Sequence, residues 1–103
     1  MATARRLKLA FSEPALADIE GIHDYVFRDS PGSALRLVQR IRQTAQRLRD
    51  QPFLGRPGTD PGTREILVRQ WPYVIVYEIH TAAKVVMVLR VFHGAHNRSP
   101  SIR

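Results

Sequence analysis

The sequence predicts an α+β fold in which a helical hairpin packs on a small, largely antiparallel sheet. The first observation is that apolar residues recur with a helical period in the first half of the chain. The second is that they fall into three strand-length runs in the last part. The resulting order is strand, helix, helix, strand, strand, strand, and such segregation is typical of α+β proteins. With 103 residues, the chain is expected to form one domain over residues 1–103.

The first predicted element is a strand from Arg6 to Phe11. Leu7, Leu9 and Phe11 alternate there with charged or small residues. This period-two pattern is typical of a strand that buries one face.

A helix is predicted from Glu13 to Phe27, with Ser12 as its N-cap. A hydroxyl at the N-cap accepts a hydrogen bond from a free backbone N–H group, and Pro14 suits the first turn because no N–H group is needed there. The apolar residues at roughly helical spacing are Leu16, Ile19, Ile22 and Val26.

A second helix follows a breaker at residues 28–32, with Ser33 as its expected N-cap and Pro52 as its limit. The short connection between the two helices predicts an antiparallel hairpin that lies on the sheet. The apolar stripe of this helix consists of Ala34, Val38, Ile41, Ala45 and Leu48. Its other side resembles a solvated face and carries Arg36, Arg40, Arg42, Arg47 and Arg49.

A loop rich in proline and glycine separates the helices from three strands. It runs from Pro52 to Gly62, and Phe53 and Leu54 are expected to pin it to the core. In the first of the two short connections that follow, Trp71 is expected to pack against the core or its rim. The connections are short enough to make the strands antiparallel neighbours, and the strands occupy residues 64–70, 73–80 and 84–93.

The charge of the chain narrows the class of partner. The formal net charge is +7, and every basic residue except Lys8 and Lys84 is arginine, whose planar fork suits phosphate and carboxylate groups. The partner is therefore expected to be anionic, either a nucleic acid or an acidic protein segment.

The composition also excludes several kinds of site. Because the chain has no cysteine, it has neither a disulfide nor a thiolate metal site, and we predict no metal and no cofactor. The amino end makes a poor signal peptide because Lys8 interrupts its apolar run. The longest apolar runs are strand-sized, so we expect no membrane span and a cytoplasmic location.

Four segments of the chain carry a recognisable pattern. They are SEPALADIEGIHDY at residues 12–25, PFLGRPG at 52–58, YVIVYEI at 73–79 and VLRVFHGAH at 88–96. In this order they resemble the RelE/ParE superfamily of toxins from bacterial type II toxin–antitoxin systems. The A-x-x-D-I-x-x-I-x-x-Y helix, the P-x-x-G loop and the final V-x-H-G-A are most similar to the ParE branch.

The resemblance implies one of two activities. RelE-like members cut messenger RNA on the ribosome, whereas ParE-like members poison DNA gyrase by binding it. Both are silenced by a cognate antitoxin with an acidic or amphipathic tail, so a hetero-oligomer with an antitoxin is expected. We predict a ParE-like toxin that binds gyrase, arrests growth and is not an enzyme. The alternatives are a metal-independent, ribosome-dependent endoribonuclease and an inactive relative retained as a binding module.

Three positions argue against the ribonuclease alternative. Metal-free RNA cleavage needs cations that stabilise an anionic transition state and groups that move protons. In an alignment on Tyr77, the lysines of one ribonuclease group correspond to Glu65 and Leu67, and an arginine that contacts phosphate corresponds to Val74. Only His93 matches a histidine that some ribonucleases use, so it is the catalytic candidate if the chain is an enzyme. The other interpretation of His93 is a structural hydrogen-bonding residue at the strand end.

The candidate target contacts lie at the C-terminal rim of the sheet. Arg90 interrupts an apolar strand, so it either pairs with an acid such as Glu65 or Glu78 or contacts the target or the antitoxin. Two imidazoles with no carboxylate or thiolate beside them make a poor metal site. The predicted rim consists of Arg90, His93, His96 and Arg98.

The candidate antitoxin contacts lie on the second helix and around the first tight turn. Arginine and aromatic residues are the types enriched at the energetic centres of protein interfaces, and they also stack on bases. The candidates are Arg36, Arg40, Arg47, Arg69 and Tyr73.

Overall fold

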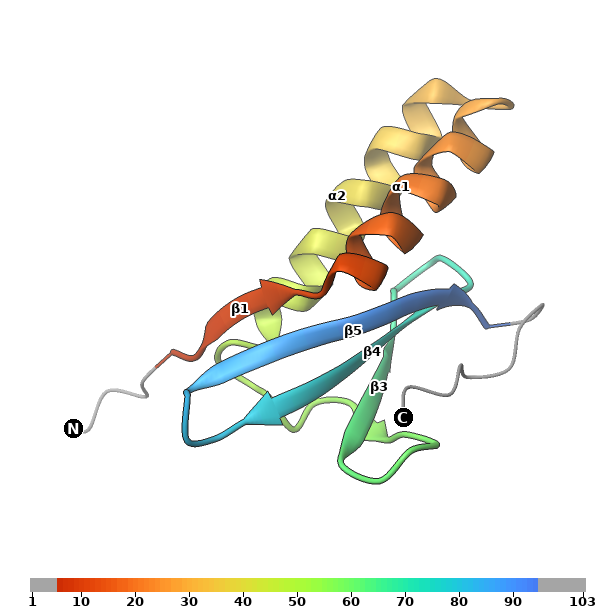
Figure 1. The fold of residues 1–103 in the computed structure, drawn as a ribbon. Helices are drawn as coiled ribbons and strands as arrows, with labels where there is room; N and C mark the ends of the chain where they lie inside the picture. The colour runs from red at the N-terminus through yellow and green to blue at the C-terminus, as the bar shows by residue number, and fades with distance from the viewer. Residues whose placement is uncertain (1–5, 95–103) are drawn as a thin grey trace.

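The computed structural model describes residues 6–94 in two layers, a helical hairpin and a five-stranded sheet. Figure 1 shows the hairpin running obliquely over one side of the sheet, with the end that joins its two helices projecting beyond the strands. The predicted α+β class and the predicted order of the main elements are confirmed. The elements are β1 (Lys8–Phe11), α1 (Glu13–Phe27), α2 (Pro31–Arg47), β2 (Arg56–Pro57), β3 (Thr63–Leu67), β4 (Tyr73–His80) and β5 (Val85–His93).

The strands are arranged in the order β1-β5-β4-β3-β2. The β3–β4 and β4–β5 pairs are antiparallel, as their short connections predicted, whereas β1 pairs with β5 in parallel. The first strand of the chain therefore lies beside the last one, and α1 leaves β1 directly above β5 (Figure 1).

The boundaries of α1 agree with the prediction, but those of α2 differ at its start. The Ser12 hydroxyl accepts a hydrogen bond from the Ala15 N–H group at 3.1 Å, as an N-cap should. The expectation that Ser33 caps α2 is wrong, because Ser30 is the cap and accepts from the Ser33 N–H group at 3.3 Å. Pro31 stands at the first position of the helix, where its ring fixes φ and its missing N–H group costs nothing.

The strand predictions also need correction, and the strand predicted over residues 64–70 ends earlier, since β3 spans Thr63–Leu67. The first strand begins at Lys8 rather than Arg6, because pairing with β5 begins at Val85, the partner of Lys8. The sequence interpretation missed β2, whose two residues Arg56 and Pro57 pair with the edge of β3. A two-residue strand that contains proline has no periodicity to reveal it.

The core lies between the hairpin and the side of the sheet that faces it. Leu37 and Ile41 of α2 are fully buried, and burial of side chains of this size contributes about 1.5–3 kcal/mol each. Trp71 packs against this cluster from its margin, as predicted. The main cluster consists of Ala15, Leu37, Ile41, Ala45, Val68, Tyr73, Ile75, Val88 and Val91.

The loop after α2 is anchored by polar groups rather than by Phe53 and Leu54. The expectation that these two residues pin it to the core is wrong, since they are 71% and 43% exposed. Instead the hydroxyl of the buried Tyr77 donates to the Pro52 carbonyl at 2.6 Å and accepts from the Gly55 N–H group at 2.9 Å. Buried polar groups need partners, and this pairing satisfies the tyrosine and two loop groups together.

Candidate functional site

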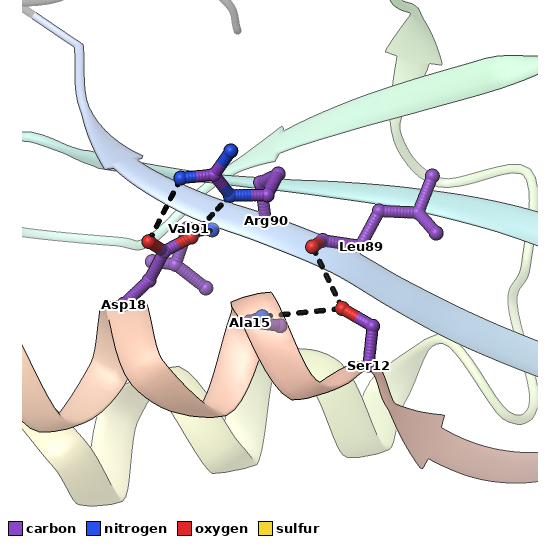
Figure 2. Close-up of polar contacts among 6 residues, drawn as sticks. All are labelled: Ser12, Ala15, Asp18, Leu89, Arg90 and Val91. Carbon is purple, nitrogen blue, oxygen red and sulfur yellow. Dashed lines mark hydrogen bonds and ion pairs between the residues drawn. The ribbon is translucent and has the colours of Figure 1, made fainter. Parts of the chain in front are cut away.

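The candidate site begins at the end of β1. Beyond that point, one side of β5 has no neighbouring strand in the part of the chain that the structure describes. β1 pairs with β5 only as far as Val88, and α1 takes its place beyond that point. The Ser12 hydroxyl donates to the Leu89 carbonyl at 2.8 Å, and the Asp18 carboxylate accepts from the Val91 N–H group at 2.9 Å (Figure 2). The N-cap of α1 and one of its side chains thus satisfy the backbone groups that a further strand would otherwise bind.

The same carboxylate forms a two-point ion pair with Arg90. Nε of Arg90 donates to Oδ2 of Asp18 at 2.8 Å, and a terminal nitrogen donates to Oδ1 at 3.0 Å (Figure 2). These hydrogen bonds raise the pKa of Arg90, although its partial burial acts in the opposite direction. The predicted pairing of Arg90 with Glu65 or Glu78 is wrong, because the guanidinium turns toward α1 instead of crossing the sheet.

A hollow of about 400 Å³ lies beside this pair, between α1 and the end of β5. Tyr73 and His93 are cross-strand partners in its wall, with their rings edge to face and 5.2 Å between centroids. Tyr25 lines the hollow from α1 and is 64% exposed, while a Cβ at Gly21 would point into open space. The arrangement is an aromatic groove with a paired arginine in its wall, a form that suits contact with another macromolecule.

Burial has a direct effect on one tyrosine of this hollow. Tyr73 is 6% exposed, and this burial raises its pKa above the ordinary value, with a smaller contribution from Tyr25. Tyr73 is therefore neutral at physiological pH. Little of its surface is open to a partner, and its predicted contact with an antitoxin stays a prediction.

Two of the four predicted rim residues come together in the structure. Arg90 and His93 both line the hollow, whereas His96 and Arg98 lie outside the described residues. The sequence interpretation missed Asp18 and Tyr25. Asp18 lies one turn before Ile22, on the side of α1 that faces the sheet, and an acid beside an apolar stripe was the available signal.

The positions aligned with catalytic cations hold side chains that cannot replace them. Glu65 is 8% exposed and has a guanidinium nitrogen of Arg56 at 3.9 Å, while Val74 is 9% exposed. Leu67 is open to solvent but carries no charge. Within residues 6–94, no group of three histidine or acidic side chains is placed to hold a metal ion.

The candidate antitoxin contacts fall in two places. Arg36 and Arg40 line a second hollow, where α2 faces the turn between β3 and β4. Arg47, in the last turn of α2, and Arg69, beside the same turn, are exposed. None of the helices in the described part of the chain is long and apolar enough to cross a membrane.

Comparison with known proteins gives a consistent set of relatives. The family described as "ParE toxin of type II toxin-antitoxin system, parDE" matches residues 9–98. The candidate toxin Y4kP of Sinorhizobium fredii is 34% identical over 94% of this chain and 97% of its own length. Toxin RelE2 of Caulobacter vibrioides is 38% identical over 79% of this chain and 88% of its own.

A solved structure of the chromosomal ParDE TA system from P. aeruginosa includes a chain similar to this one. The two superimpose with a TM-score of 0.77 and are 26% identical, and the match covers 86% of this chain and 97% of the other. The relatives thus carry both ParE and RelE names.

Proposed function

Because this chain belongs to the ParE toxin family of type II toxin–antitoxin systems, we propose that it arrests growth by binding DNA gyrase. Under this proposal it acts in the cytoplasm and by stoichiometric binding rather than by catalysis. A cognate antitoxin holds it silent, as the ParDE system from P. aeruginosa suggests by similarity. Target binding is assigned to the hollow between α1 and β5.

The observation that supports binding over catalysis is the neutralised charge beside His93. Among the described residues that line this hollow, Arg90 is the single permanent cation, and it is paired with Asp18. An anionic phosphorane needs positive charge that no neighbouring carboxylate offsets. Since the pair has no net charge, Arg90 gives His93 little help in RNA cleavage.

The same geometry offers several features of a protein interface. Tyr25 is exposed at the hollow, and two nitrogens of Arg90 are held in a fixed orientation by Asp18. A side chain that is ordered before binding loses less conformational entropy on association. Aromatic and arginine side chains in a concave, partly dry setting are the usual energetic centres of interfaces.

A supercoiling assay tests the proposal directly. Purified toxin is expected to inhibit gyrase supercoiling and to leave ribosome-bound messages intact. His93→Ala should reduce inhibition only in part, because His93 is one contact among several. The matched control is His80→Ala, at the other end of the β4–β5 hairpin, where His80 lies 3.0 Å from Glu78. Unchanged supercoiling together with codon-spaced cuts in ribosome-bound message would refute gyrase binding.

One observation favours the ribonuclease as a second candidate function. His93, Tyr73 and Arg90 line one hollow, so an imidazole, a phenol and a guanidinium lie close together. If these groups cut RNA, His93→Ala should abolish cleavage almost completely, because a proton-transfer group contributes about 10²–10⁴ in rate. The size of the His93→Ala effect thus separates the two functions.

A further inference from the structure

The second hollow is formed by one stripe of α2 and the turn between β3 and β4. Arg36, Gln39, Arg40 and Gln43 stand three or four residues apart, so they share one side of the helix. They face Gln70 and Trp71 across a hollow of about 460 Å³. This second hollow is separate from the hollow beside Asp18 and Arg90, which lies between α1 and the end of β5.

The charge of this hollow has one sign. Within residues 6–94, no acidic residue lines the hollow, and α2 contains none. Arg36 donates to the Ser33 hydroxyl at 2.9 Å, and that neutral partner leaves its charge uncompensated. The hollow therefore presents two guanidinium groups and three amides, all of which can donate hydrogen bonds.

The turn keeps a polar side chain in the hollow at a conformational cost. Gln70 has a φ of 70°, in the left-handed region where glycine is the least strained residue. Strained residues of this kind persist where the surrounding structure fixes them, and they gather at functional sites. Glutamine at this position supplies an amide that glycine would lack.

From this geometry we infer that the hollow binds a carboxylate-bearing peptide segment of a protein partner. The inference rests on the proposed function for the identity of the partner, which under that proposal is the antitoxin. The guanidinium groups of Arg36 and Arg40 pair with the carboxylate, and two-point pairs of this type are among the stronger hydrogen bonds. The amides of Gln39, Gln43 and Gln70 bind the peptide backbone, because each amide both donates and accepts.

The structure favours a peptide over a nucleic acid. Base stacking needs an open aromatic face, whereas Trp71 is half-buried and packs against the core. Phosphate contacts need donors alone, and the three glutamines also offer acceptors. A hollow of this volume fits one or two side chains rather than a run of nucleotides.

A matched pair of substitutions on α2 tests the inference. Gln43→Glu places a carboxylate inside the hollow, and Gln46→Glu makes the same change on an exposed position outside it. Glutamate and glutamine have similar helix propensities, so both variants should fold, which thermal unfolding by circular dichroism verifies. The probe is the purified product of the reading frame adjacent to the toxin, measured by calorimetry, with oligo-dT as the nucleic-acid probe.

The expected result is a loss of affinity for that protein of about tenfold or more in Gln43→Glu and little loss in Gln46→Glu. Equal losses in the two variants, no loss in either, tighter binding of oligo-dT or no binding of the protein probe by the unmodified toxin would each overturn the inference. Growth arrest by the toxin alone is scored in parallel. If Gln43→Glu still arrests growth but escapes the antitoxin, both proposals stand. If the unmodified toxin arrests no growth, the proposed function fails, whereas the peptide site is still judged by calorimetry.

Discussion

Replacing Asp18 by asparagine should destabilise the protein by about 2 kcal/mol. Asp18 accepts three hydrogen bonds, one from the Val91 N–H group and two from Arg90. An amide of the same size has one acceptor oxygen, and its NH₂ group faces the donors of the guanidinium. The bond from the Val91 N–H group contributes about 1 kcal/mol, and we count about 1 kcal/mol for the ion pair because the Arg90 side chain is 37% exposed and partly hydrated.

Thermal unfolding followed by circular dichroism measures this loss. For a domain of this size, about 2 kcal/mol corresponds to a fall in Tm of roughly 10 °C. The matched control is Asp24→Asn on the same helix, where the side chain is 68% exposed and lies 3.2 Å from a ring nitrogen of the neighbouring His23. Asp24→Asn should change the free energy of unfolding by no more than about 0.5 kcal/mol.

A double-mutant cycle with Arg90→Met isolates the pair. The double variant Asp18→Asn/Arg90→Met should be less destabilised than the sum of the single variants, with a coupling free energy of about 1 kcal/mol. If Asp18→Asn lowers Tm no more than Asp24→Asn does, or if the cycle shows no coupling, then the ion pair between α1 and β5 does not hold these elements together.

Two further predictions concern the loop anchor and the buried tyrosine. Gly55→Ala should destabilise the protein by about 1–3 kcal/mol in urea unfolding, because a Cβ there would lie 2.6 Å from the Glu65 carbonyl oxygen. Gly21→Ala should instead stabilise it by about 0.5–1 kcal/mol, since that position is open and alanine favours the helix, and a comparable loss in both variants would contradict the steric argument. Because the pKa of Tyr73 is raised in the folded protein, its contribution to the free energy of unfolding is complete below pH 10.0, the ordinary tyrosine pKa. This contribution is lost as the pH rises through the higher folded-state pKa. Tyr73→Phe should remove this part of the alkaline loss, and an unchanged alkaline unfolding curve would show that Tyr73 titrates normally.

Local sequence signals predicted an element of this fold correctly where they all indicated the same boundaries. Ser12 caps α1 and the apolar period holds to Phe27, so cap and period agree on the same helix. At α2 the hydroxyls of Ser30 and Ser33 competed for the cap position. Pro31 decides between them, because proline is favoured at the first helical position.

Tertiary contacts explain the errors. Phe53 and Leu54 look like core residues in the sequence, but the Tyr77 hydroxyl anchors their loop and leaves them exposed. The partner of Arg90 lies 72 residues away on α1, a distance at which spacing rules carry no information. At the candidate site, the sequence identified Arg90 and His93 but could not reveal that Asp18 neutralises the arginine.

The pairing of β1 with β5 also bears on how the chain folds. The α1–α2 hairpin and the β3–β4–β5 meander each form from contacts between neighbours in the sequence, whereas Ser12 must reach Leu89, 77 residues further on. Closing so long a loop costs entropy before the contacts are gained, and non-local pairing of this kind slows folding. Because β5 lies between β1 and β4, a chain cut short before Val85 would lose the strand that joins its two local units. We therefore expect the hairpin to dock onto the sheet late in folding, and incomplete chains to be inert.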